Sequence, residues 1–132
     1  MSTILTTTIK ANTLLHSDGS TTTAPSIPAL DQRMAKAWAN FDMSPFSVRN
    51  SYNTSSITDA GTGRFQINFT NALPSVNYAW LGLSGNYNNT TTTGRDVTND
   101  GNLSVNSLSG RVTQADNTSQ DMDYVAVVVF GS

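Results

Sequence analysis

The sequence contains no cysteine and no glutamate, and its 132 residues include only 1 histidine. Without cysteine there are no disulfides, thiol nucleophiles or thiolate metal ligands. A lone histidine needs other nitrogen or sulfur ligands before it can hold zinc. His16 lies beside Asp18 in a polar turn sequence, which indicates a solvated side chain rather than a general base. We therefore expect a protein that is not an enzyme and has no catalytic residues and no cofactor.

Charge is scarce as well. Charged residues make up 12% of the chain, and the net charge is -2. The cations are scattered singly, whereas nucleic-acid binding needs a positive stripe that neutralises phosphates, so no nucleic-acid partner is expected. The N-terminal residues lack a basic segment followed by an apolar run, and the apolar run Tyr124–Phe130 is too short to span a bilayer. We expect synthesis in a cytoplasm without a signal peptide, and no membrane partner.

Apolar residues are also few, at 37%, so the core is thin for the length and partner subunits are expected to add stability. Threonine, serine and asparagine fill the remaining space; they are mediocre helix formers, and threonine favours strands. Period-two patterns recur at spacings of roughly 8 to 15 residues, which predicts an all-β fold, a β-sandwich of jelly-roll-like type.

The clearest predicted strand covers residues 64–70, with Phe65, Ile67 and Phe69 facing inward. Residues 35–42 alternate with an alanine-rich face. Residues 78–83 are apolar on both faces and predict a central strand, and residues 123–130 are expected mid-sheet, covered on both faces. Further strands are expected at 46–52, around Ile57, at the edge within 84–101, and at 102–109, which Gly110 would end with a turn.

Residues 1–34 read as an extended N-terminal arm in front of a domain at 35–132. A weak strand pattern at 3–15 precedes a turn at 16–20, a linker with two prolines at 21–28, and one helical turn at 31–35. The arm has too few large apolar residues to fold alone, so it must lie on its own domain, a neighbouring subunit or another partner. Its candidate docking residues are Ile4, Leu5, Ile9, Leu14 and Leu15.

The polar stretch 84–101 predicts a long exposed loop. Within it, Asn86, Tyr87, Asn88 and Asn89 have the composition of an adaptable recognition surface, which makes them candidate ligand contacts. The aspartates at 96 and 100 resemble a calcium loop only loosely, because the EF-hand spacing and its terminal glutamate are missing, and Asp100-Gly101 is also an ordinary turn pair. We expect no metal site, and the Asp96–Asp100 segment stays open in this respect.

Several stretches carry distinctive motifs: AKAWANFD at 35–42, VRNSYNTSSITD at 48–59, GTGRFQINFT at 61–70, ALP at 72–74 and VAVVVFG at 125–131. Together they resemble a family of tail fibre and virion structural proteins of tailed bacteriophages, especially those of cyanobacteria. The resemblance covers most of the chain and is weakest between Asn86 and Gly101. It implies a β-sandwich-like head domain, often trimeric, held on the virion by its N-terminus, and it transfers no catalytic residues.

The expected function is therefore that of a phage virion structural protein, a tail fibre or fibre-like module. It would form a homotrimer, dock on other virion proteins through the arm, and display the domain, with the 84–101 loop available to a host cell-surface glycan. One alternative is a capsid decoration or cement protein that stabilises the shell. Another is a stand-alone carbohydrate-binding module.

Overall fold

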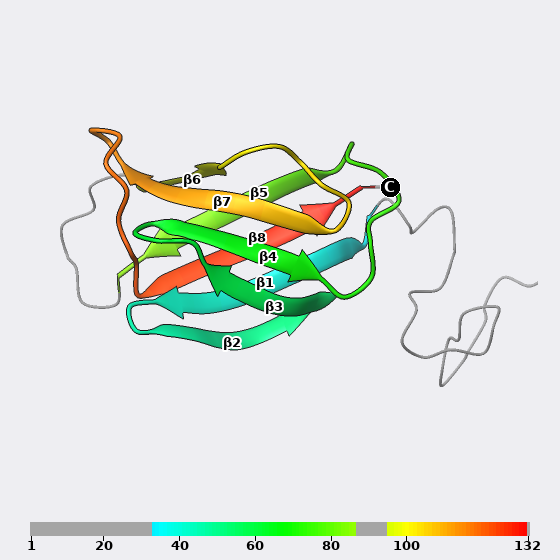
Figure 1. Ribbon diagram of the computed structural model, residues 1–132, viewed down its shortest axis with the longest axis horizontal. Helices are drawn as coiled ribbons and strands as arrows, with labels where there is room; N and C mark the ends of the chain where they lie inside the picture. The colour runs from blue at the N-terminus through cyan, green and yellow to red at the C-terminus, as the bar shows by residue number, and fades with distance from the viewer. Residues whose placement is uncertain (1–32, 87–94, 132) are drawn as a thin grey trace, which may run out of the picture.

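The computed structural model describes residues 33–86 and 95–131. They form two four-stranded antiparallel sheets that pack face to face as a β-sandwich (Figure 1). Sheet A has the order β2-β1-β8-β5, and sheet B has the order β3-β4-β7-β6. The strands are β1 (Ala35–Met43), β2 (Phe46–Tyr52), β3 (Thr54–Asp59), β4 (Arg64–Phe69), β5 (Ala79–Gly85), β6 (Arg95–Asn99), β7 (Ser107–Gln114) and β8 (Tyr124–Phe130). The predicted all-β sandwich is confirmed. In the described part of the chain, no helix is long and apolar enough to cross a membrane.

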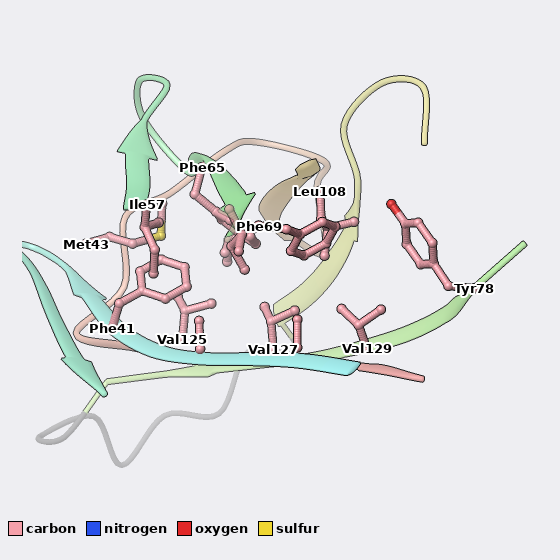
Figure 2. Packing of buried hydrophobic residues seen from close by; sticks show 14 of the residues in the cluster. Phe41, Met43, Ile57, Phe65, Phe69, Tyr78, Leu108, Val125, Val127 and Val129 are labelled. Carbon is pink, nitrogen blue, oxygen red and sulfur yellow. The ribbon is translucent and has the colours of Figure 1, made fainter. Parts of the chain in front are cut away.

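The core lies between the two sheets and follows the period-two alternation of the strands. Val125, Val127 and Val129 point from β8 toward sheet B (Figure 2). Phe41 of β1 and Phe65 of β4 join the sheets with an edge-to-face contact, their ring centroids 5.0 Å apart. Such aromatic pairs add stability beyond the apolar area that they bury.

Four sequence predictions about the strands are confirmed. Phe65, Ile67 and Phe69 face inward from β4, and the alanine-rich face of β1 is buried. β8 lies mid-sheet, between β1 and β5. The edge strand expected within 84–101 is β6, at the edge of sheet B.

Three other expectations are wrong. Residues 78–83 do not form a central strand: β5 is the edge strand of sheet A, and its outward side chains are exposed. The outward face of β8 is only half-buried, so β8 is not covered on both faces. The strand expected at 102–109 is β7, which starts at Ser107, and Gly110 lies inside it because the Phe65 ring occupies the place of a side chain there.

A single residue, Asn53, carries the chain from β2 in sheet A to β3 in sheet B. Its φ of 52° is left-handed, a conformation that asparagine tolerates better than most residues. Its amide nitrogen donates to the carbonyls of Lys36 and Asn71 at 3.0 and 3.1 Å, and its amide oxygen accepts from the Asn71 N–H at 2.8 Å. The side chain therefore pairs like a piece of backbone and fixes this corner of the sandwich.

Candidate interaction surface

The outer face of sheet A carries two rows of side chains that cross all four strands. Residues directly opposite each other in antiparallel strands point to the same face of the sheet. The first row is Tyr52, Trp38, Val128 and Leu81, and the second is Asn50, Asn40, Ala126 and Leu83. The rows bring together segments that are far apart in the sequence, and their β1, β8 and β5 members are mostly apolar.

The side chains of β5 on this face are strongly exposed. Leu81 is 67% exposed and Leu83 is 70% exposed, although each lies beside other apolar groups. Together with Trp38 and Val128 they line an open groove of about 600 Å³. Contiguous exposed apolar surface of this kind marks sites where a soluble protein contacts a partner. We refer to the groove and its lining residues on β1, β8 and β5 as the sheet A groove.

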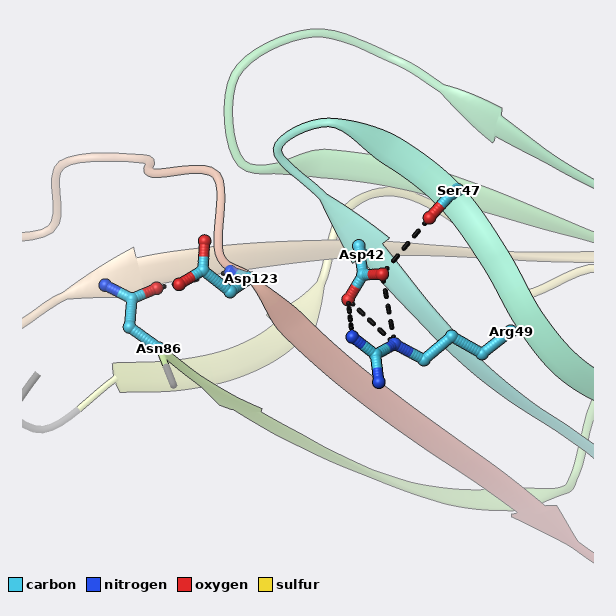
Figure 3. Close-up of polar contacts among 5 residues, drawn as sticks. All are labelled: Asp42, Ser47, Arg49, Asn86 and Asp123. Atoms are coloured by element: carbon cyan, nitrogen blue, oxygen red, sulfur yellow. Dashed lines mark hydrogen bonds and ion pairs between the residues drawn. The ribbon is translucent and has the colours of Figure 1, made fainter. Parts of the chain in front are cut away.

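Charged groups lie beside the sheet A groove and not within it. Arg49 of β2 donates from Nε to both carboxylate oxygens of Asp42, at 2.9 and 3.0 Å, and its terminal nitrogen lies 2.8 Å from Asp42 Oδ1. Ser47 Oγ donates to the same carboxylate at 3.1 Å (Figure 3). This cluster gives the apolar surface a polar border, and the Asp42 carboxylate already has its partners within the chain.

The free edge of β5 adjoins the groove. Among the described residues, no strand pairs with the side of β5 that faces away from β8. β5 contains no charged residue and no proline, which natural edge strands often use to prevent pairing with other chains. The other edge strands do carry charge: Arg49 on β2, Asp59 on β3, and Arg95 and Asp96 on β6. β5 is therefore the edge best suited to accept another strand.

The close packing of β5 on β6 depends on a glycine. A Cβ atom at Gly82 would lie 2.5 Å from Cγ1 of Val97 and 2.7 Å from its Cβ, well inside van der Waals contact. The inward position of β5 is thus filled by Val97 from the other sheet, while Leu81 and Leu83 point outward. This arrangement closes the core beneath β5 and leaves its outer face to solvent.

Of the four predicted loop contacts, only Asn86 lies within the described residues. Asn86 follows β5, and its side-chain oxygen accepts from the Asp123 N–H at 3.2 Å, which ties the end of β5 to the start of β8 (Figure 3). Tyr87, Asn88 and Asn89 lie outside the described residues, and so do the proposed arm residues Ile4, Leu5, Ile9, Leu14 and Leu15. Of the helical turn expected at 31–35, only the last residues are described, and Ala35 begins β1.

Two aspartates, Asp100 and Asp121, have contacts within the sandwich. Asp96 lies in the extended strand β6, Arg95–Asn99, rather than in the loop that the sequence predicts for 84–101. Asp100 lies 3.5 Å from the Arg64 guanidinium, and Asp121 accepts from the Gly63 N–H at 2.6 Å. Within residues 33–86 and 95–131, no three potential metal-binding side chains come together.

A small polar recess of about 180 Å³ lies at the Asn53 corner, lined by Tyr52, Asn53, Thr70 and Asn71. Tyr52 is 40% exposed, and the other lining residues include two asparagines. The Asn53 amide, however, is fully engaged with backbone groups on both sides. The recess therefore has fewer free polar groups than its lining suggests, and the sheet A groove is the stronger candidate.

No sequence motif points to the outer face of sheet A as a site. The only local signal is the apolar character of 78–83 on both faces, which by itself predicts burial within one chain. Comparisons of the chain with family models, curated proteins and solved structures gave no match.

Proposed function

We propose that this chain is a structural module of a bacteriophage virion, a tail fibre or fibre-like component that works through surface contacts and assembles as a homotrimer. The observation that carries the proposal is the sheet A groove, with Leu81 and Leu83 about two-thirds exposed on adjoining outward positions of one strand. The motifs at 35–42, 48–59 and 61–70 supply the link to virion proteins. No catalytic step is assigned to any residue.

Covering the exposed leucines of the sheet A groove would stabilise an assembled form. Fully burying a leucine side chain contributes about 1.5–3 kcal/mol. Covering Leu81 and Leu83 from their present exposure would therefore contribute roughly 2–4 kcal/mol per subunit, before the cost of association. Burial of Trp38, Val128 and Ala126 in the same contact would add to this. Together these contributions favour an assembled form of a chain whose own core is small.

Light scattering and native mass measurement of the full chain test this proposal. The expected mass is three times the 14.1 kDa of one chain. The double variant Leu81→Asp, Leu83→Asp should give single chains with an unchanged far-ultraviolet circular dichroism spectrum, because both side chains point outward. A matched control is Ser55→Asp on β3, which is also exposed and should leave the mass unchanged. A wild-type chain that remains a monomer at all concentrations contradicts the proposal.

The capsid decoration function differs from the fibre function in what fails when the protein is removed. Removing the protein from virions and measuring both infectivity and heat stability separates the two. Lost infectivity with an intact shell supports the fibre function, and a heat-labile shell supports decoration. Host-surface glycan binding is tested on a glycan array with the wild type and Tyr87→Ala; binding that depends on Tyr87 supports it.

A further inference from the structure

The sheet A groove and the free edge of β5 form one continuous surface. Its apolar side chains are uncovered, and its backbone edge is not paired with a described strand. Leu81 and Leu83 are exposed apolar side chains, and the outer backbone groups of β5 have no partner strand among the described residues. A single extended segment with apolar side chains would satisfy both, because an added strand forms backbone hydrogen bonds and places alternate side chains on each face.

The chain itself contains a segment of this chemistry. Residues 3–15 (TILTTTIKANTLL) are rich in threonine, isoleucine and leucine, and their only charge is Lys10. Threonine and isoleucine favour strands. The low charge of this segment matches the uncharged edge of β5, since charges on either side would oppose pairing.

The register of sheet A shows how far this segment would have to reach. Ala35 and Ala79 both pair with Phe130, so β1 and β5 start at the same end of the sheet, two strand spacings apart. A strand added at the free edge of β5 would lie one spacing further out, roughly 15 Å from β1. Residues 16–33 lie between the segment and β1, and when extended they span up to about 60 Å. Pro25 and Pro28 favour an extended form. The connection is therefore long enough to reach the β5 edge of a neighbouring copy, which is the contact that the homotrimer proposed above calls for.

We propose that residues 3–15 of one copy add as an extra strand to the free edge of β5 in a neighbouring copy, with their apolar side chains against Leu81 and Leu83. Repeated with the same orientation around three copies, this contact closes into a ring. The inference rests on the homotrimer proposed above and identifies the segment and the edge that hold it together.

Photo-crosslinking of the full chain tests this placement. The photoreactive residue p-benzoylphenylalanine replaces Leu81, which is exposed enough to accept a large side chain. A second protein carries it in place of Leu83, and a control carries it in place of Thr58, which is exposed on β3 at the opposite edge of the other sheet. Each protein is assembled with wild-type chains labelled with heavy isotopes, irradiated and digested, and the joined peptides are identified by mass spectrometry.

The expected product joins position 81 or 83 to a heavy-labelled peptide from residues 3–15. The control with the photoreactive residue at position 58 should not form a product with that peptide. Three results overturn the placement: a product formed only within one copy, a product with sandwich strands of another copy, or a yield no higher than the control. Native mass measurement of the same samples separates the two proposals. Single chains contradict the homotrimer itself, whereas a trimer with a different product contradicts only the placement of residues 3–15.

Discussion

Replacing Gly110 with alanine is expected to destabilise the sandwich, although alanine usually suits a strand better than glycine. Gly110 lies in β7 directly opposite Phe65 of β4, on the inner face of sheet B. A Cβ atom there would lie 2.7 Å from Cε2 and 2.9 Å from Cε1 of the Phe65 ring, and would also meet Cζ. The ring cannot easily move away, because it is 1% exposed and packs against Phe41.

The magnitude follows from two opposing effects. Overpacking a filled core typically costs about 1–3 kcal/mol. Replacing glycine by alanine also restricts the unfolded chain, which stabilises the folded state by about 0.4–1 kcal/mol. The two ranges leave a loss of about 0–2.6 kcal/mol in the free energy of unfolding. Because three atoms of a buried ring lie under 3 Å from the new Cβ, we expect a loss of about 1–2 kcal/mol within that range. In urea, this corresponds to a midpoint lowered by roughly 0.5–1 M at unchanged slope.

Urea unfolding followed by tryptophan fluorescence measures this loss. Gly85→Ala in β5 is the matched control, since no atom lies within 4 Å of the new Cβ and its backbone is not left-handed; its stability should be unchanged or slightly raised. Adding Phe65→Leu to Gly110→Ala should recover part of the loss, with a coupling of about 1 kcal/mol between the two sites. A neutral or stabilising Gly110→Ala variant would refute the reasoning, because it would show that the ring yields freely.

Three further predictions concern single residues. Asn53→Gly keeps the left-handed corner but removes its bonds to Lys36 and Asn71, so urea unfolding should show a loss of about 1–3 kcal/mol. Burial raises the pKa of Tyr78, and the Tyr78 hydroxyl donates to the Ser104 carbonyl. Because the pKa is higher in the folded than in the unfolded chain, the neutral hydroxyl contributes its full stabilisation below the unfolded pKa near 10. That stabilisation is lost as the pH rises through the folded pKa. Thermal melting should therefore show a steeper alkaline loss in the wild type than in Tyr78→Phe. Gly82→Ala should lower the melting temperature by forcing β5 away from Val97, and Val97→Ala in the same chain should restore part of it.

The sequence predicted the parts of the fold that depend on local alternation. Phe65, Ile67 and Phe69 on β4 show period two within six residues, and their inward direction was confirmed. Glycine is common in turns, so the sequence predicts a turn at Gly110. The reason for a glycine inside β7 is the Phe65 ring, which belongs to a strand far away in the sequence. The corner at Asn53 carries no local signal either, since its left-handed backbone is held by groups from two other segments.

The candidate surface escaped prediction for a related reason. The apolar character of 78–83 was recognised, but local composition does not distinguish side chains covered by a second sheet from side chains left for another molecule. That distinction depends on the position of β5 at the edge of sheet A, which is set by pairing with β8. The groove exists only where Trp38, Val128 and Leu81 come into one row, and no stretch of sequence contains all three.

The central place of β8 has a consequence for how the protein is made. Among the strands of the described residues β8 comes last in sequence, yet it lies between β1 and β5 and bonds to both. The hairpin of β1 and β2 can form early during synthesis, but sheet A stays split until β8 leaves the ribosome, and such long-range pairing is slow. Until then β1 and β5 both present open edges and uncovered apolar faces. A chain that lacks β8 should therefore be prone to aggregation, because β1 and β5 keep open edges and an uncovered apolar face.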